Sequence, residues 1–199
     1  ETGAGVRHVY VDKSADIAKA IPILINSKCD RPSVCNAAET LLVHQSIAEQ
    51  FLPLALKALS QAGVVINADA KSKVIADKLG ITTKLATDKS YATEYGTLEI
   101  NLAQVSDVVG AIEHIAKYGT NHTEAIVAED KDVITTFTAL NDCAAIMVNA
   151  STRFTDGGQM GFGAEIGISN QKLHARGPMG LEAMTTTTWI VSGNGQIRQ

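Results

Sequence analysis

Short apolar runs alternate with amphipathic stretches along most of the chain. The apolar runs predict strands over 6–11, 64–67, 98–103, 125–128 and 144–148. Apolar residues that recur every three or four positions predict helices over 14–26, 70–79, 107–117 and 131–140. This repeated alternation of strand and helix favours an α/β fold with a largely parallel sheet flanked by helices.

One long stretch near the start is predicted to be helical. It runs from Asn36 to about Ala62, after a loop over 27–34, with a break near Pro53 because proline removes a backbone donor inside a helix. The helix before that loop is predicted to have Ser14 as its N-cap, since serine accepts hydrogen bonds from unpaired backbone N–H groups there.

The last quarter of the chain has a different character. The segment 154–167 holds five of the 16 glycines and has no clear period, which is typical of a loop that approaches another group closely. The segment 185–191, TTTTWIV, is β-branched and predicts a strand that lies beyond the core and pairs with another chain. We therefore expect a catalytic domain over 1–184 and a C-terminal oligomerisation strand and tail over 185–199.

Composition narrows the class of protein. Hydrophobic residues make up 45% and charged residues 19%, as in a folded, soluble chain. A net charge of -4 without a Lys/Arg run argues against nucleic-acid binding. Apolar runs of about six residues are too short for a membrane span, which needs roughly 20. The first residues show no signal-peptide pattern.

Three cysteines and five scattered histidines bear on compartment and metal binding. An odd number of cysteines without a secretory signal predicts a reduced, cytoplasmic protein. No two of them have metal-finger spacing, so no metal site is expected. Gly3 and Gly5 begin a Gly-x-Gly-x-x-Gly spacing, but His8 interrupts it, so no nucleotide-binding half is visible.

Cys35 is the candidate nucleophile. Asn36 and Glu39 have capping-box spacing, which predicts a helix that begins just after the cysteine. The N–H groups and the dipole of such a helix would lower the pKa of the thiol and hold an oxyanion. The alternative is a buried, inert cysteine, which is the commoner role of a lone Cys and the one expected for Cys29 and Cys143.

Four long segments carry a family resemblance. They are 32–44 (PSVCNAAETLLVH), 105–126, 149–158 (NASTRFTDGG) and 172–182 (KLHARGPMGLE). Each resembles a hallmark segment of the γ-glutamyl phosphate reductases, and the resemblance covers essentially all 199 residues. It implies the aldehyde-dehydrogenase superfamily and that fold.

The resemblance also implies a reaction. The Cys35 thiolate would displace phosphate from L-glutamyl 5-phosphate, and NADPH would reduce the thioester to L-glutamate 5-semialdehyde, in proline biosynthesis. The family has an upstream NADP-binding domain that is not seen here, so the chain is expected to be an inactive fragment on its own. A homodimer is expected, in which the C-terminal strand crosses to the partner.

Further site residues follow from the resemblance. Glu94 falls where the superfamily binds the nicotinamide ribose hydroxyls; the alternative is a solvated acid in a turn. Arg153, flanked by Ser151 and Thr152, is the first candidate for the substrate carboxylate, since arginine binds carboxylates with two parallel hydrogen bonds. Arg176 is the second candidate. For both arginines the alternative is a salt bridge that fixes the glycine-rich loop.

Glu1 lies 34 residues before Cys35, the spacing of base and nucleophile in aldehyde dehydrogenases. A reductase does not hydrolyse its thioester, so a chance match of the spacing explains Glu1 at least as well as a catalytic base does. Two other functions stay open at this point. One is a general aldehyde dehydrogenase that oxidises aldehydes to acids, and the other is a non-catalytic, oligomer-forming domain.

Overall fold

The computed structural model describes residues 5–199, and a parallel sheet of seven strands forms its centre. The strand order is β4-β3-β5-β2-β1-β6-β7. The strands are β1 (His8–Val11), β2 (Thr40–His44), β3 (Val65–Ala68), β4 (Lys84–Leu85), β5 (Glu99–Val105), β6 (Thr123–Val127) and β7 (Ala145–Val148). The predicted α/β class with a parallel sheet is therefore confirmed.

Helices cover both faces of this sheet. The longer ones are α1 (Ile17–Cys29), α2 (Ala48–Gln61), α3 (Ala70–Lys78), α5 (Val108–Tyr118) and α6 (Lys131–Leu140). Alternate residues of one strand serve the two faces: Val9 and Val11 pack into the core with α1, α2 and α3, whereas Tyr10 packs into the core with α5 and α6. A short helix, α4 (Asp88–Tyr91), precedes β5.

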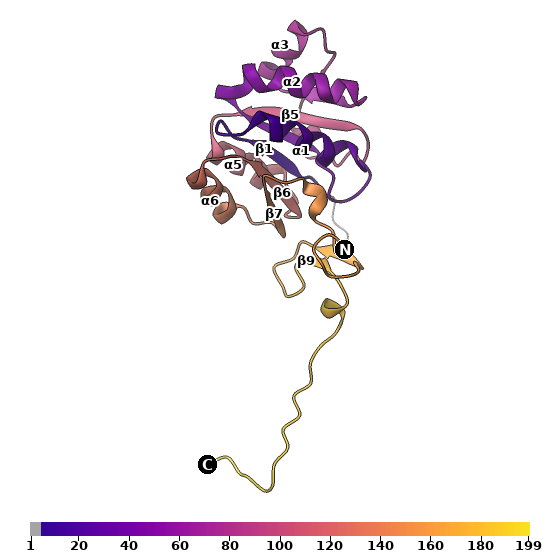
Figure 1. Cartoon of the computed structure of the whole chain (residues 1–199), viewed down its shortest axis with the longest axis vertical. Helices are drawn as coiled ribbons and strands as arrows, with labels where there is room; N and C mark the ends of the chain where they lie inside the picture. Colours follow the sequence, from indigo (N-terminus) through magenta and orange to yellow (C-terminus); the bar gives the residue numbers. More distant parts are fainter. Residues whose placement is uncertain (1–4) are drawn as a thin grey trace.

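A hairpin and an extended tail follow the sheet. The hairpin pairs β8 (Gly167–Ser169) with β9 (Gly177–Met179) in antiparallel fashion. Beyond the short 3-10 helix Glu182–Met184, the tail extends away from the rest of the molecule (Figure 1). The segment predicted as a strand, 185–191, has no strand assignment and pairs with no part of the described chain. Its pairing with a second chain stays a prediction.

Most predicted elements are confirmed to within a few residues. Helices α3, α5 and α6 begin after Asp69, Asp107 and Asp130, each of which accepts hydrogen bonds from backbone N–H groups of the first turn. The predicted cap of α1 is wrong. Asp16 caps that helix, while the Ser14 hydroxyl accepts hydrogen bonds from the N–H groups of Glu129 and Asp130.

The predicted helix over 36–62 is wrong in its first third. Residues Thr40–His44 form β2, which is buried along its whole length between β1 and β5. The true helix starts at Ala48 and continues through Pro53 without a break. Pro53 lies in the second turn, so it removes only one hydrogen bond near the helix start. The loop predicted over 27–34 begins later, because α1 continues to Cys29.

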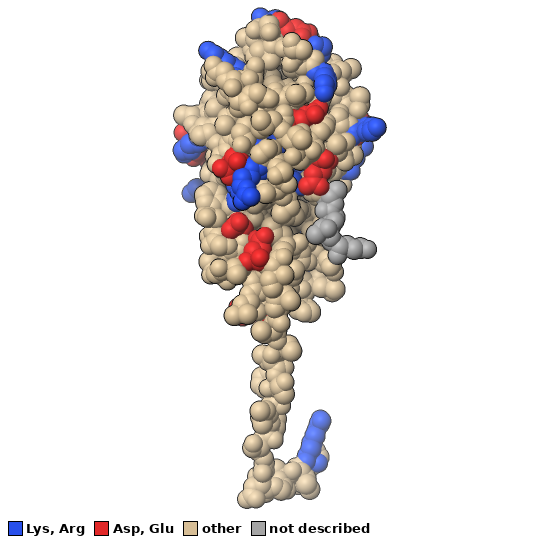
Figure 2. All heavy atoms as spheres, turned by 90° about the vertical axis from the view of Figure 1, so that its right-hand side faces the viewer, with Lys and Arg blue, Asp and Glu red and all other residues tan. Residues whose placement is uncertain are grey.

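No helix within residues 5–199 is long and apolar enough to cross a membrane. Glu1, the possible base, lies outside the described residues. Charged side chains of both signs are interspersed on the face seen in Figure 2, whereas the tail carries no charge until Arg198.

Candidate functional site

Cys35 lies in the turn 30–39 that joins α1 to β2, at the edge where the parallel strands begin. The predicted helix after the cysteine does not exist: residues 36–39 are turn and coil, and β2 starts at Thr40. The sulfur therefore has no helix N-terminus beside it. Asn36 keeps its place next to the nucleophile candidate but loses the predicted role of helix cap.

The electrostatic environment of Cys35 also differs from the prediction. Desolvation by the surrounding chain raises the pKa of the Cys35 thiol, and the Arg7 guanidinium opposes that rise. Glu165 and Glu94 raise the thiol pKa further. The residue itself is exposed, while Cys29 and Cys143 are partly buried. Arg7 and, to a smaller extent, the backbone N–H of Cys35 lower the thiol pKa here, and no helix dipole contributes.

Arg7 was not identified from the sequence, yet its side chain connects several segments at this edge of the sheet. Its side chain is fully buried. Nε–H donates to the Ala37 carbonyl at 2.9 Å and an Nη2–H donates to the Val34 carbonyl at 3.3 Å. An Nη1–H donates to Glu94 Oε1 at 2.9 Å. One guanidinium thus links the turn on both sides of Cys35 to Glu94.

Glu94, the predicted cofactor contact, lies close to this turn. Its second carboxylate oxygen accepts a hydrogen bond from the Gly5 N–H at 2.7 Å. The side chain is 30% exposed and paired with Arg7, so it is not a freely solvated acid of a turn. Both oxygens already have one partner within the chain, and each retains acceptor capacity. Contact with a ribose stays a prediction.

Two predicted site residues, Asn36 and Arg153, are in contact. The Arg153 guanidinium donates to Asn36 Oδ1 and, through Nε, to Asp30 Oδ2 at 2.9 Å. The Asn36 amide in turn donates to the Thr155 carbonyl at 2.8 Å. A cavity of about 190 Å³ lies beside Arg153. Two partners therefore hold the Arg153 guanidinium. Its side chain is still 17% exposed, so a small ligand in this cavity could contact it.

Ser151 and Thr152 anchor the chain before Arg153. The Ser151 hydroxyl lies 3.1 Å from the Ser27 hydroxyl of α1, and the Thr152 N–H donates to the same Ser27 oxygen. Both residues are buried. Their observed contacts fix the start of the 152–154 turn to α1, and a contact with substrate stays a prediction.

Arg176 lies in another environment. Its Nη2–H donates to Asp142 Oδ1 at 2.9 Å, and Lys172 pairs with the same carboxylate. These contacts fasten the chain before β9 to the loop between α6 and β7. Arg176 is thus held in a salt bridge, but one that fixes the chain before β9 rather than the glycine-rich loop, and its position gives no support to a joint site with Arg153.

His122 is a further buried residue at this edge of the sheet. Its Nδ1 lies 2.7 Å from the Thr123 hydroxyl, and its Nε2 has no partner within residues 5–199. Burial, and then the charge of Arg7, lower the pKa of His122 to about 4. The ring is therefore neutral at pH 7.

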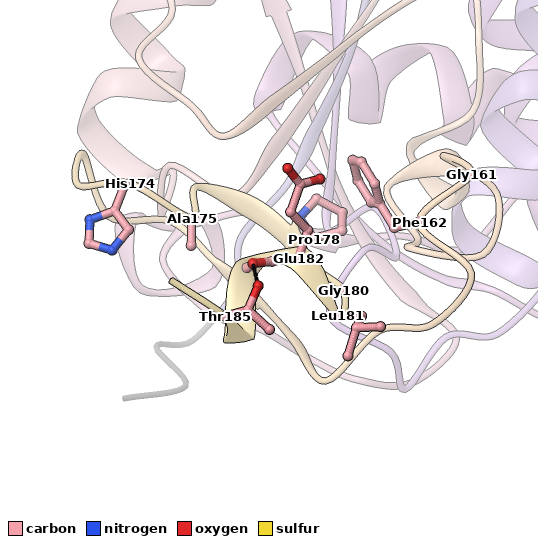
Figure 3. Close-up of a pocket in the computed structure, with 10 residues that line it drawn as sticks. Gly161, Phe162, His174, Ala175, Pro178, Gly180, Leu181, Glu182 and Thr185 are labelled. Carbon is pink, nitrogen blue, oxygen red and sulfur yellow. Dashed lines mark hydrogen bonds between the residues drawn. The ribbon is translucent and has the colours of Figure 1, made fainter. Parts of the chain in front are cut away.

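A larger cavity lies elsewhere. It measures about 730 Å³ and is lined by the glycine-rich loop, the hairpin and the start of the tail, including Phe162, His174 and Leu181 (Figure 3). None of the candidate site residues lines it. Among residues 5–199 no group of three or more His, Cys, Asp or Glu side chains could hold a metal ion.

Comparison with known proteins gives a consistent result. No protein-family model matches the chain. It is 56% identical over 198 residues to a γ-glutamyl phosphate reductase of Kineococcus radiotolerans, covering all of this chain and 46% of that protein. It is 55% identical over 202 residues to the corresponding reductase of Bifidobacterium adolescentis, with 47% of that protein covered. The chain thus spans about half the length of the curated relatives it matches.

Solved structures agree with these relatives. The γ-glutamyl phosphate reductase of Thermotoga maritima superimposes with a TM-score of 0.94 at 48% identity, over 100% of this chain and 47% of that one. An acetylating aldehyde dehydrogenase of Geobacillus thermoglucosidasius superimposes with a TM-score of 0.58 at 26% identity, over 79% and 42% of the two chains. The fold is therefore aldehyde-dehydrogenase-like.

Proposed function

The chain belongs to the γ-glutamyl phosphate reductase family, and on that premise we propose that Cys35 is the nucleophile of the whole protein. That protein would reduce L-glutamyl 5-phosphate to L-glutamate 5-semialdehyde, a step of proline biosynthesis in the cytoplasm. One observation carries the assignment: Cys35 is exposed in a turn beside a buried cation, whereas Cys29 and Cys143 are partly buried. Desolvation raises the pKa of Cys143 to about 12, which disfavours its thiolate.

The proposed covalent step uses residues of this chain alone. The Cys35 thiolate attacks the acyl carbon of the substrate, a carbon–sulfur bond forms, and the bond to the phosphate oxygen breaks. Inorganic phosphate leaves with the bonding electron pair, and a thioester remains on Cys35. Within residues 5–199 the backbone N–H groups of Cys35 and Asn36 donate to no other residue, although the Cys35 N–H interacts with its own sulfur and lowers the thiol pKa. We assign to them the negative charge that develops on the carbonyl oxygen.

NADPH, when bound, supplies the hydride that reduces the thioester. The described residues fit this cofactor only at one point, Glu94, whose carboxylate retains acceptor capacity for ribose hydroxyls. No Gly-x-Gly-x-x-Gly turn stands between a strand and a helix of residues 5–199. We therefore assign most of the cofactor contacts to a domain outside this chain.

The amino-acid end of the substrate needs a cation for its carboxylate, and we assign Arg153, with Ser151 and Thr152 before it. The proposal is supported by the cavity beside Arg153 and by its hydrogen bond to Asn36, the neighbour of Cys35. Arg176 is the second candidate, and its salt bridge with Asp142 makes it the weaker one.

We also propose that the whole protein forms a homodimer, held together by the segment 185–191, which is predicted to form a strand.

Substitution of the three cysteines in the whole protein tests the central assignment. Cys35→Ala is expected to lower the rate of acyl-phosphate reduction by at least about three powers of ten, since no other group can carry the acyl chain. Cys29→Ala and Cys143→Ala are matched controls that should keep most of the activity. Near-normal turnover by Cys35→Ala would refute the assignment.

A cofactor titration tests the proposal that most of the NADPH contacts lie outside this chain. The 199-residue chain is expected to bind NADPH too weakly to detect at micromolar concentration and to reduce no acyl phosphate. Hydride transfer needs the nicotinamide held about 3–3.5 Å from the reacting carbon, and one glutamate cannot fix it. Tight binding in calorimetry would show that the cofactor site lies within these residues.

A further inference from the structure

We propose that Arg7 is a positioning residue for Cys35: its guanidinium holds the turn that carries the cysteine and places a fixed positive charge beside the sulfur. This inference rests on the proposed function, in which Cys35 is the nucleophile. Arg7 itself touches neither substrate nor reacting atoms in this account. It acts through the backbone on either side of the cysteine.

The hydrogen bonds of Arg7 bracket Cys35 along the chain. One goes to the Val34 carbonyl, the residue before the cysteine, and another goes to the Ala37 carbonyl, two residues after it. A planar guanidinium offers five N–H donors in fixed directions, so it can bind both carbonyls and a carboxylate at once. A lysine ammonium at the same place would have one nitrogen for all three acceptors. The turn 34–37 has no helix or strand of its own to fix it.

The charge of Arg7 is secured by acids on its other side. Glu94 Oε1 lies 2.9 Å from Nη1, and Glu39 Oε1 lies 3.8 Å from Nη2. Glu39 also accepts a hydrogen bond from Lys28 Nζ at 2.8 Å, and the side chains of Arg7, Glu39 and Lys28 are all fully buried. Burial lowers the pKa of Arg7 and the two acids raise it again, so the guanidinium stays protonated.

The groups that act on the Cys35 thiol have opposite signs. Arg7 lowers its pKa, against desolvation, Glu165 and Glu94, which raise it. His122, which lies near Arg7, is neutral at pH 7 and adds no charge. Arg7 is therefore the cation on which a useful fraction of thiolate depends.

The absence of a side chain at Gly5 leaves the space that the Arg7 guanidinium occupies. A Cβ atom on Gly5 would lie 1.5 Å from Arg7 Nη1 and 2.6 Å from Arg7 Cζ. Any other residue would push the buried guanidinium aside, although the φ of Gly5 is not one that requires glycine. Gly5→Ala is thus a way to displace Arg7 without removing its charge.

The test is the pH dependence of alkylation of Cys35 in the whole protein. Iodoacetamide labelling is followed by mass spectrometry of the peptide that carries Cys35, with the Cys29 peptide as an internal reference. Arg7→Met should raise the apparent pKa of Cys35 by about one unit, so that labelling below that pKa becomes about tenfold slower. Gly5→Ala should shift the pKa in the same direction by less.

Two further variants separate charge from fold. Arg7→Lys should restore most of the thiol pKa, since it keeps the cation, but should leave kcat reduced because the turn loses its double anchor. Arg31→Met, which removes an exposed charge from the same turn, should leave the pKa of Cys35 unchanged. Should Arg7→Met fail to fold, the pKa shift expected in Gly5→Ala still decides the question.

Opposite results overturn the inference. An unchanged pKa of Cys35 in folded Arg7→Met, or in Gly5→Ala when Arg7→Met is unfolded, would show that Arg7 does not act on the sulfur. Failure of this inference and failure of the proposed function can be told apart. A pKa shift together with an active Cys35→Ala would sustain Arg7 and refute the nucleophile, whereas no shift with an inactive Cys35→Ala would do the reverse.

Discussion

Two segments rich in apolar and β-branched residues differ in burial and in strand pairing. Residues Thr40–His44 form β2, the strand between β1 and β5, and all five are buried. Residues 185–191 are extended and unpaired within the described chain, with Trp189 90% and Val191 91% exposed. The two differ in what surrounds them: β2 has a strand on each side and helices on both faces, whereas the tail has no such neighbours.

The comparison shows that β-propensity needs a partner to become a strand. A strand is stabilised by ladder hydrogen bonds and by packing on its faces, both of which come from other segments. The tail contains residues of high β-propensity, but no other segment of the described chain lies beside them to form a ladder or to pack on their faces. An extended apolar segment of this kind is typical of a surface that another chain covers.

The largest expected effect on stability comes from one buried leucine of β2. Leu42→Ala should lower the free energy of unfolding by about 3–5 kcal/mol, because the residue is fully buried against α5 and α6. Its matched control in the tail is Ile190→Ala, which should change that free energy by less than about 0.5 kcal/mol. Denaturant unfolding measures both. Equal losses would show that the tail packs against the sheet.

The second prediction concerns the site at the edge of the sheet. Arg153→Met in the whole protein should lower kcat/KM by about two powers of ten, or about 3 kcal/mol, because a charged contact to the substrate carboxylate is lost. Arg176→Met should have a much smaller effect, since that side chain pairs with Asp142. The ranking of the two arginines in steady-state kinetics decides between them, and the reverse ranking would move the carboxylate site to Arg176.

The third prediction uses His114, a half-buried histidine of α5. Burial, His8 and Lys117 lower the pKa of His114 to about 3, and both ring nitrogens are buried without a partner in residues 5–199. Below about pH 6.5 the unfolded chain binds a proton that the folded chain does not. The contribution of His114 to the free energy of unfolding should therefore fall by about 1.4 kcal/mol per pH unit toward pH 3, in addition to that of His122.

His114→Phe should keep the ring contacts with Tyr91 and Tyr118 and remove this part of the pH dependence. His174→Gln, at an exposed histidine, serves as the control and should leave the pH dependence unchanged. Urea unfolding between pH 4.5 and 7 gives the slope directly. The same slope in His114→Phe would show that other groups cause the loss of stability in acid.

The smallest effect on folding is expected from removal of the tail. At a concentration where the 199-residue chain is monomeric, a chain that ends at Ala183 should unfold within about 0.5 kcal/mol of it, because the removed residues are exposed in the monomer. At higher concentration the shorter chain should still run as a monomer in sedimentation velocity, while the longer chain runs as a dimer. The same mass for both chains would refute strand exchange through 185–191.

Periodicity and cap residues predicted the helices best. Helices α3, α5 and α6 each have an aspartate cap, and α5 and α6 also have a clear apolar face, so their limits were found almost to the residue. Strand β2 was missed because a fully buried run has no alternation that distinguishes it from a buried helix. The misplaced helix then led to a wrong account of the thiol pKa of Cys35.

The candidate site was predicted only where a motif carried it. Cys35 and Asn36 were named from a capping-box spacing and then from a family segment, Arg153 was named from another family segment, and the structure brings Asn36 and Arg153 into contact. Arg7 was not named from the sequence, although it stands between Val6 and His8 in the run 6–11 that was predicted as a strand. An arginine inside a run that is expected to be buried is unusual, because burial of a charge is costly unless it is paired. That rule would have marked Arg7 for attention.

The most direct test is to trap the acyl group on the protein. The whole protein is given L-glutamyl 5-phosphate without NADPH, quenched in acid and digested, and each cysteine peptide is examined by mass spectrometry. The account predicts a glutamyl thioester on the peptide that carries Cys35, and none in Cys35→Ala. A glutamyl group on Cys29 or Cys143, or release of phosphate and full activity without any acylated cysteine, would contradict it.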